Sequence, residues 1–376
     1  MIYLDNAATT KPSQAAIDAV ISAAENFGNP SSLHRIGLDA EKLIKVSAKT
    51  VSAMIGAKPE NIIFTSGGTE SNNTAIFGAV KHTRKKQLIT TAIEHPSVME
   101  PFKRLEKEGY KLDIIPVGTD GIIDFEAFEK MLSDDTALVS IMHVNNETGS
   151  IQPIQKVKEL IDEKAKGATL HIDAVQSFAK LPINVTKLGA DFMSLSAHKI
   201  NGFKGTGALY VKNRSAIDAH ICGGGQQGNL RSGTENVAGI AAFGAAAKEH
   251  NKDEYEYILA LRKKLKDGIL ENIPETVYNG SESEFSPYVL NISFLGIKAE
   301  ILLHSLESKG IYVSTGSACS SNKPMPSHVL AAMGKTREEI MGAVRFSFDS
   351  NVSESDIDQT LNVLSKSVAD IRKYIR

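Results

Sequence analysis

The sequence predicts an α/β protein whose large domain is built around a largely parallel β-sheet. Short apolar runs rich in β-branched residues alternate with longer helical patterns as far as residue 211. Runs of this kind are typical of strands that are buried on both faces between layers of helices. The chain of 376 residues is long enough for two or three domain-sized units, and its pattern changes after about residue 250. We therefore expect a smaller α+β domain to follow the large one.

The large domain is predicted to contain strands separated by helices. The strands are expected at 61–65, 87–91, 111–117, 137–144, 169–173, 192–196 and 207–211. The helices are expected at 14–26, 37–56, 69–81, 124–132, 154–166 and 235–249. Apolar residues recur in these segments with the helical period, and the last segment is rich in alanine. The alternation favours a single sheet with helices on its faces.

The rest of the chain is predicted to form the smaller domain. Its expected elements are a polar helix at 252–270, strands at 289–295 and 311–315, and a final helix at 354–375. No proline-rich linker separates the two parts, so we expect the domains to pack closely with a site between them. The predicted domains are 15–250 for the large one, and 1–14 together with 251–376 for the small one.

Composition and charge exclude several classes of protein. The formal net charge is −2, which provides no overall field for holding nucleic acid or an anionic membrane. The two cysteines, Cys222 and Cys319, are too few for a disulfide framework or a cysteine-rich metal site, and no two histidines have helical metal-site spacing. We therefore expect no bound metal. Asp5 interrupts the position of a secretion signal, and no apolar run of about 18 residues occurs, so a cytoplasmic location is expected.

The segment FTSGGTES, at 64–71, is a candidate phosphate site. An apolar strand leads through paired glycines into a helix that starts near Thr69, and free N–H groups at a helix start bind phosphate. The same pattern also fits a simple turn in which Thr69 or Ser66 caps the helix. No GxxxxGK[ST] loop is present and no GxGxxG motif follows the first strand, which disfavours a nucleotide site.

Two further segments carry candidate catalytic side chains. LHIDAVQS places Asp173 at the carboxyl end of a strand, where open α/β sheets bind ligands. A protonated pyridine nitrogen would suit this carboxylate, and a helix cap is the alternative. SLSAHKINGFKG places Lys199 just past the next strand, where a lysine can become a Schiff-base nucleophile. A solvated surface position is the alternative reading, and Lys204 is a competing candidate.

Together with other motifs, these residues resemble the cysteine desulfurases, the NifS/IscS-like group of class V aminotransferase-fold enzymes. The motifs are DNAATT (5–10), FGNPSS (27–32), SGGTES (66–71), IEHPSV (93–98), HVNNETG (143–149), DAVQS (173–177), SAHK (196–199), GGGQ (223–226), RSGTENV (231–237) and GSACSS (316–321). They follow the family order from residue 3 to about residue 350. The resemblance implies the aspartate aminotransferase-like fold of type I, with a mostly parallel seven-stranded sheet.

The resemblance also implies pyridoxal 5'-phosphate as the cofactor. It assigns the Schiff base to Lys199, the partner of the pyridine nitrogen to Asp173, a contact with the ring hydroxyl to Gln176 and stacking on the ring to His95. The implied phosphate ligands are Gly68, Thr69, Ser196 and His198, joined by Thr234 from the second subunit of a homodimer. Gln227, Gly228 and Asn229 depart from the family pattern, which leaves the dimer contacts in doubt.

The resemblance further identifies substrate and sulfur-handling residues. Arg345 is expected to bind the substrate carboxylate, and Asn145 to orient substrate and cofactor. Cys319 lies in the segment 314–326, whose small, polar and proline residues predict a mobile loop. We expect its thiol to accept the sulfur as a persulfide, with His95 as the candidate that removes the thiol proton. Cys222 has no comparable loop and is predicted to be a packing residue.

The implied reaction converts L-cysteine to L-alanine and passes the sulfur to an acceptor protein. Acceptors in iron–sulfur cluster assembly and in tRNA thiolation are both consistent with these residues, and no direct contact with nucleic acid or membrane is expected. A selenocysteine lyase or another class V enzyme with this cofactor is the alternative enzyme. A noncatalytic sulfur carrier or scaffold is the alternative outside enzymes.

Overall fold

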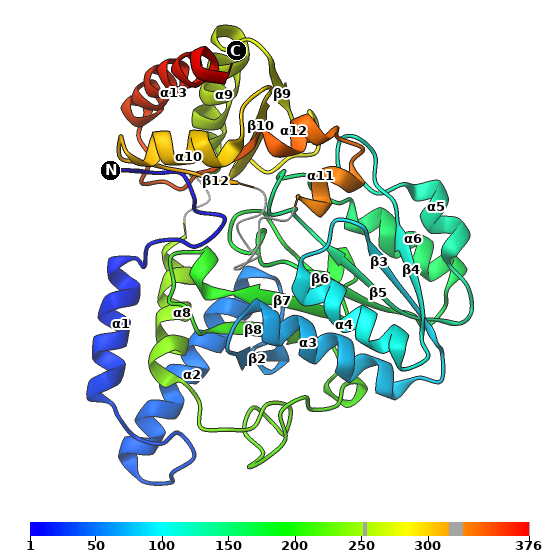
Figure 1. Cartoon of the computed structure of the whole chain (residues 1–376). Helices are drawn as coiled ribbons and strands as arrows, with labels where there is room; N and C mark the ends of the chain where they lie inside the picture. The colour runs from blue at the N-terminus through cyan, green and yellow to red at the C-terminus, as the bar shows by residue number, and fades with distance from the viewer. Residues whose placement is uncertain (251–253, 316–325, 376) are drawn as a thin grey trace.

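A seven-stranded sheet forms the centre of the larger lobe in this computed structural model, which describes residues 1–250, 254–315 and 326–375 (Figure 1). The strands are β2 (Ile62–Thr65), β3 (Gln87–Thr91), β4 (Lys111–Ile115), β5 (Thr136–Met142), β6 (Thr169–Asp173), β7 (Phe192–Ser196) and β8 (Gly207–Val211). Their order is β2-β8-β7-β6-β5-β3-β4. Only β8 runs antiparallel to its neighbours, β2 and β7. The prediction of a mostly parallel sheet with these strands is confirmed.

Helices cover both faces of this sheet. They are α1 (Gln14–Glu25), α2 (Arg35–Met54), α3 (Gly68–Ala79), α4 (Pro96–Lys107), α5 (Phe125–Met131), α6 (Ile154–Lys164), α7 (Val185–Leu188) and α8 (Val237–Glu249). The predicted helices are confirmed with ends shifted by one to two residues, and α4 and α7 are additional. No described helix combines the length and the apolar character needed to cross a bilayer.

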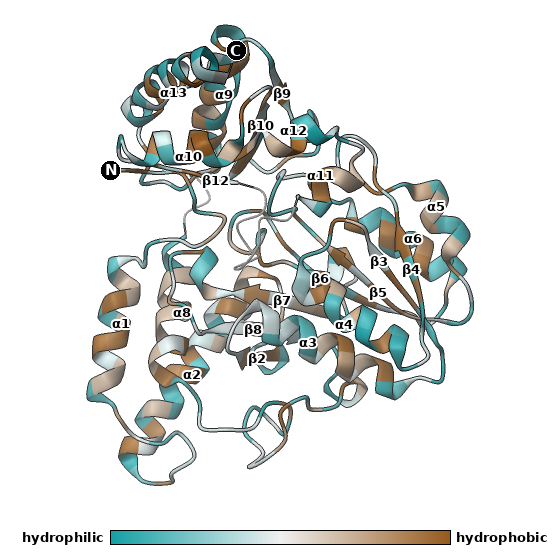
Figure 2. Cartoon of the chain, viewed as in Figure 1, coloured by the Kyte–Doolittle hydropathy of each residue, from teal (hydrophilic) through white to brown (hydrophobic). Residues whose placement is uncertain are grey.

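Alternation along the strands directs side chains into two separate cores. Ile63 and Leu88 pack with α3 and α4 in one layer. Their neighbours Phe64 and Ile89 point to the opposite face and pack with α2, α6 and α8. Since both faces of the central strands are buried, strands such as β2 and β8 are mostly apolar, which is why they stand out in the sequence. Figure 2 shows these brown strands between helices that carry teal, hydrophilic surfaces.

The smaller lobe has its own sheet and its own core. The strands β12 (Ser314–Thr315), β13 (Ala343–Ser347), β10 (Val289–Phe294) and β9 (Thr276–Tyr278) form one antiparallel sheet, and β1 (Ile2–Tyr3) pairs with β11 (Ile311–Tyr312). The helices are α9 (Glu254–Asn272), α10 (Ala299–Glu307), α11 (His328–Ala332), α12 (Arg337–Met341) and α13 (Glu354–Ile375). The single strand predicted at 311–315 is wrong, because it is divided between two sheets at Val313.

The N-terminal segment, residues 4–13, connects the two lobes. Ile2 and Leu4 belong to the core of the smaller lobe. Leu4 then accepts a hydrogen bond from Ser347 N–H, while the N–H of Thr10 donates to the carbonyl of His198 in the larger lobe. The predicted domain boundaries at 14/15 and 250/251 stay predictions, but this segment fixes how the edges of both lobes meet. The functional site described below lies beside it.

The aromatic cluster under the sheet provides a test of the larger core. Phe243 of α8 is fully buried and makes edge contacts with Phe64 at 6.5 Å and Phe178 at 5.8 Å. We expect Phe243→Ala to lower the free energy of unfolding by about 3–5 kcal/mol, because a large cavity replaces the ring. Thermal melting followed by circular dichroism measures this change. Tyr374→Ala, at a 91% exposed position, is the control, and equal melting of both variants would contradict the role of the cluster.

Candidate functional site

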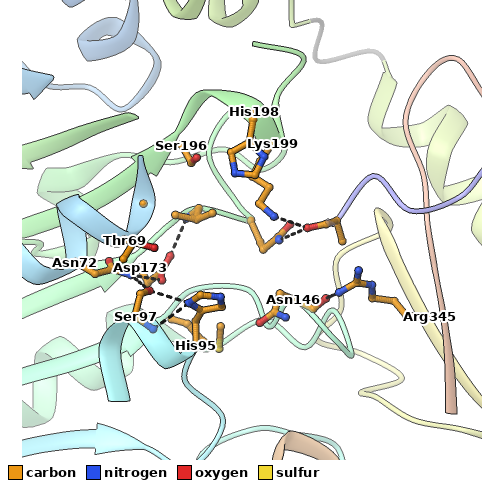
Figure 3. A pocket seen from close by; sticks show the side chains of 15 residues that line it. Thr69, Asn72, His95, Ser97, Asn146, Asp173, Ser196, His198, Lys199 and Arg345 are labelled. Carbon is orange, nitrogen blue, oxygen red and sulfur yellow. Dashed lines mark hydrogen bonds between the residues drawn. The ribbon is translucent and has the colours of Figure 1, made fainter. Parts of the chain in front are cut away.

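A cavity of about 250 Å³ opens at the carboxyl ends of the parallel strands (Figure 3). Its walls come from β6, β7, the starts of α3 and α4, the N-terminal segment and β13. The lining residues are Ala7, Gly68, Thr69, Asn72, His95, Ser97, Met142, Asn146, Asp173, Val175, Gln176, Ser196, His198, Lys199 and Arg345. Most of the site residues predicted from the sequence therefore meet here. Three further lining residues are not among the predicted ones: Ser97 and Asn146 lie within the motifs IEHPSV and HVNNETG, and Asn72 directly follows SGGTES.

The start of α3 forms one end of the cavity. Glycine suits position 68 because an added Cβ would lie 2.6 Å from the Val175 side chain and would force it to shift. None of the described hydrogen bonds uses the N–H groups of Gly68 or Thr69, as expected at the first turn of a helix. Ser196 is buried beside them, and its Oγ has no hydrogen-bond partner among the described residues. Together these donors form a cradle for an anionic group.

His198 stands at the same end of the cavity. Burial, together with the charges of Lys199, Lys204 and Lys180, lowers the pKa of His198 to about 4. The ring is therefore neutral at neutral pH. Its Nδ1 lies 3.2 Å from Thr9 Oγ1 of the N-terminal segment, which holds the ring in place.

Asp173 ends β6 and is 5% exposed. Its Oδ2 accepts a hydrogen bond of 2.8 Å from Asn72 Nδ2, and its Oδ1 accepts one of 3.0 Å from Val175 N–H. Two donors from different elements therefore fix the plane of this carboxylate. A cationic group of a ligand is a suitable further partner.

Lys199 lies in a 3-10 turn, η3 (Ala197–Lys199), directly after β7. Its Nζ donates to the carbonyl oxygens of Ala7 at 2.6 Å and Ala8 at 2.7 Å. The same Ala7 carbonyl accepts from Gln176 Nε2 at 2.9 Å. This bond leaves Gln176 Oε1 buried without a partner among the described residues, so it can accept a hydrogen bond from a ligand hydroxyl.

His95 caps α4 and lines the cavity. Its Nδ1 accepts a hydrogen bond of 3.1 Å from the backbone N–H of Ser97 and lies 2.8 Å from Ser97 Oγ. Burial lowers the pKa of His95, Asp173 opposes this shift, and the charges of Lys199 and His328 add to it. The imidazole is therefore neutral in the resting protein.

Arg345 projects from β13 and is 3% exposed. One terminal nitrogen pairs with Asp5 at 2.8 Å and the other donates to the Asn146 carbonyl at 2.9 Å. The buried Nε has no partner among the described residues. Arg345 therefore forms a buried ion pair, yet the guanidinium still has donors for a planar anion.

The structure does not bring the Asn145 side chain into the cavity. Asn145 is fully buried, its Nδ2 donates to the Ile93 carbonyl, and its Oδ1 accepts from the N–H groups of Glu147 and Thr148. It therefore shapes its own turn, and the expected contact with substrate or cofactor does not fit. The next residue, Asn146, lines the cavity instead.

Three other sequence predictions concern residues away from the described cavity. Thr234 is exposed in the single chain, and its contact from a second subunit stays a prediction. Cys319 lies outside the described residues. Cys222 is exposed, so its predicted packing role is wrong for this chain, because the glycine-rich turn around it lies on the surface. Within the described ranges, no group of three or more His, Cys, Asp or Glu side chains could hold a metal.

Comparisons with known proteins agree with this geometry. The model of the family Aminotransferase class-V matches residues 2–360. The chain is 41% identical to "Cysteine desulfurase IscS" of Dictyoglomus turgidum, over 99% of this chain and 95% of that protein. It is 40% identical to "Cysteine desulfurase IscS 1" of Archaeoglobus fulgidus, over 99% of this chain and 98% of that protein.

Solved structures have the same fold over nearly the whole chain. A structure described as "NIFS-LIKE PROTEIN" superposes with a TM-score of 0.92 at 36% identity, covering 98% of this chain and 99% of that one. A structure described as "SspA in complex with cysteine" superposes with a TM-score of 0.82 at 32% identity, covering 93% of this chain and 99% of that one.

Glu94 lies fully buried beneath the cavity, between β3 and α4. Its Oε1 accepts hydrogen bonds of 2.8 Å from Thr91 Oγ1 and from Met142 N–H, whereas Oε2 has no partner among the described residues. Burial, with a smaller contribution from the Asp173 charge, raises the pKa of Glu94 to about 8. The two hydrogen bonds act in the opposite direction and lower it. The carboxyl is therefore mostly protonated at neutral pH.

This protonation makes stability depend on pH. Because the folded pKa of about 8 lies above the ordinary value of 4.5, the contribution of Glu94 is fully present below about pH 4.5 and is lost as pH rises through 8. We expect Glu94→Gln, which is neutral at every pH, to reduce the loss of stability between pH 5 and pH 8.5. Urea unfolding at several pH values measures it. Glu100→Gln, at an exposed pair with Lys103, is the control, and an unchanged profile in Glu94→Gln contradicts the raised pKa.

Proposed function

The chain belongs to the class V aminotransferase family and, within it, to the cysteine desulfurases, and on this premise we propose how its cavity removes sulfur from L-cysteine. The enzyme depends on pyridoxal 5'-phosphate. The observation that carries the proposal is the meeting of Lys199, Asp173 and Arg345 in one cavity, because these side chains supply an amine, a buried carboxylate and a carboxylate-binding guanidinium.

The polar groups of the cavity fit pyridoxal phosphate. The cradle of Gly68, Thr69, Ser196 and His198 would hold the phosphate, with Thr234 of the partner subunit as a further donor in a homodimer. Asp173 would pair with the ring nitrogen, the unpartnered Gln176 Oε1 would accept from the ring hydroxyl, and His95 would cover one face of the ring. When bound, the cofactor supplies an electron sink for negative charge at the substrate Cα.

Lys199 has two tasks in this scheme. Its amine would hold the cofactor, and its Nζ, when free, would take the Cα proton of the substrate and return a proton to the product. The Ala7 and Ala8 carbonyls, at 2.6 and 2.7 Å, keep the amine at one position in the cavity. This placement fits a group that must reach the same carbon in each turnover.

Arg345 would bind the substrate carboxylate. Its pairing with Asp5 and with the Asn146 carbonyl holds the guanidinium plane, while the buried Nε and the remaining N–H groups are available to the substrate. We propose that Asn146, which lines the cavity, takes the orienting role predicted for Asn145.

Cys319 would accept the sulfur. Its thiolate forms a bond to the substrate sulfur while the Cβ–S bond breaks, and the bonding electrons remain on carbon. One proton then reaches that carbon, so the products are a Cys319 persulfide and L-alanine. A sulfur-acceptor protein removes the terminal sulfur, and acceptors for iron–sulfur assembly or tRNA thiolation both suit this chemistry. A reactive thiol of this type fits a reducing cytoplasm.

Serine substitution of each cysteine tests the sulfur-transfer step. We expect Cys319→Ser to bind the cofactor and to show its visible absorbance. Because the variant lacks the nucleophile, it should lose more than about 90% of the alanine and sulfide that the enzyme forms from L-cysteine with a reductant. Cys222→Ser is the matched control and should behave as the unmodified enzyme. Sulfide release by Cys319→Ser at the normal rate would falsify the assignment. A colourless protein that forms neither product would favour the noncatalytic scaffold.

Replacement of Arg345 tests carboxylate binding. We expect Arg345→Lys to lower kcat/KM for L-cysteine roughly 10- to 100-fold, mainly through KM, because one charged hydrogen bond contributes about 1.5–3 kcal/mol. Steady-state kinetics measures the effect. Arg372→Lys, whose guanidinium pairs with Glu275 in the smaller lobe, is the control. An unchanged KM in Arg345→Lys excludes the proposed contact.

A further inference from the structure

A continuous chain of hydrogen bonds joins Asp173 to His95 along the wall of the cavity. Asn72 Nδ2 donates to Asp173 Oδ2 at 2.8 Å and to Ser97 Oγ at 2.8 Å. Ser97 Oγ in turn lies 2.8 Å from His95 Nδ1, which also accepts from the Ser97 backbone N–H at 3.1 Å. Figure 3 shows these side chains side by side. The cofactor-facing carboxylate and the cofactor-facing ring are therefore held by one pair of residues.

The direction of each hydrogen bond follows from the groups involved. A carboxylate only accepts, so the Asn72 amide must point its NH₂ group toward Asp173. The second N–H of that group then occupies Ser97 Oγ as an acceptor, which leaves the Ser97 hydroxyl hydrogen for His95. A backbone N–H can only donate, so His95 Nδ1 must present its lone pair to Ser97. The proton of a neutral imidazole therefore resides on Nε2.

We infer that Ser97 and Asn72 are positioning residues that hold His95 as the neutral Nε2–H imidazole, so that His95 serves the reaction as a hydrogen-bond donor and not as a proton acceptor. This inference deepens the proposed function and rests on it for the reaction. It replaces the sequence-based expectation that His95 removes the thiol proton of Cys319. No hydrogen bond joins Nε2 to any other described residue, so this N–H is available to a ligand in the cavity.

The arrangement opposes protonation of the ring. A proton on Nδ1 would face the backbone N–H of Ser97, which can only donate, and would break that hydrogen bond. The ionisable groups around the ring are Asp173 on β6, Lys199 on η3 and His328 on α11, and only Asp173 favours the imidazolium. Glu94, the preceding residue, turns its carboxyl to Met142 N–H and is mostly protonated at neutral pH. Geometry and charge therefore act in the same direction.

Nitrogen-15 NMR of the holoenzyme labelled in its histidine rings tests the protonation state directly. His95→Asn identifies the His95 signals by their absence. We expect an unprotonated, pyridine-type Nδ1 and a protonated, pyrrole-type Nε2 at neutral pH, with a His95 pKa below the ordinary value of histidine. A protonated Nδ1 at neutral pH, in either the other tautomer or the imidazolium, overturns the inference.

Variants of Ser97 test the positioning role. Ser97→Ala removes one donor to the neutral ring, so we expect the pKa of His95 to rise by roughly 0.5–1 unit, and Ser97→Thr, which keeps the hydroxyl, to restore it. Ser140→Ala is the matched control, because Ser140 Oγ lies 2.7 Å from Nδ1 of the buried His171, outside the cavity. It should leave the His95 titration unchanged. An unshifted His95 pKa in Ser97→Ala overturns the role of the hydroxyl.

Assays on the same samples separate this inference from the proposed function. If L-cysteine yields alanine and sulfide while Nδ1 is protonated, the inference fails and the desulfurase function stands. If the Nε2–H tautomer is present but neither product forms, the tautomer assignment stands and the function fails, together with the role of His95 in that reaction.

Discussion

The site depends above all on the N-terminal segment, whose backbone carbonyls and one carboxylate hold side chains from both lobes. The Ala7 carbonyl accepts from Lys199 Nζ at 2.6 Å and from Gln176 Nε2 at 2.9 Å, and Asp5 pairs with Arg345 at 2.8 Å. Lys199 and Gln176 belong to the larger lobe, whereas Arg345 belongs to the smaller one. The relative position of amine and guanidinium, which an amino-acid substrate must span, therefore depends on a few residues at the start of the chain.

The second constraint is the repulsion among basic side chains beside the cavity. Lys180 is buried close to Lys199 and Arg345. Burial and these two positive charges lower the pKa of Lys180 to about 7, while the charge of Asp349 acts in the opposite direction. Basic groups held this close together favour the binding of anions. A phosphate at the start of α3 and a carboxylate at Arg345 would relieve this repulsion, which favours an anionic cofactor and an amino-acid substrate together.

Much of the fold was predictable because the strands are buried on both faces and are therefore continuous apolar runs, as in Ile62–Thr65 and Gly207–Val211. Helix α4 was missed because Pro101 and its charged residues obscure the apolar pattern, although Pro96 suits a first turn. The split at Val313 was not visible in the sequence, since pairing partners distant in the chain decide which sheet each half joins. Local patterns predict elements, but they do not predict long-range pairing.

The site was predictable to the level of motifs, and less so to individual contacts. Asn145 and Asn146 are identical in type, and only the turn that buries one of them decides which lines the cavity. Ser97 and Asn72 could have been selected by asking which side chains support the acid and the ring. The same N-cap hydrogen bond that starts α4 also occupies His95 Nδ1. The helix cannot therefore keep its cap if His95 is protonated on that nitrogen, and in this protein the start of a helix and the protonation state of a catalytic-site ring are set by a single contact.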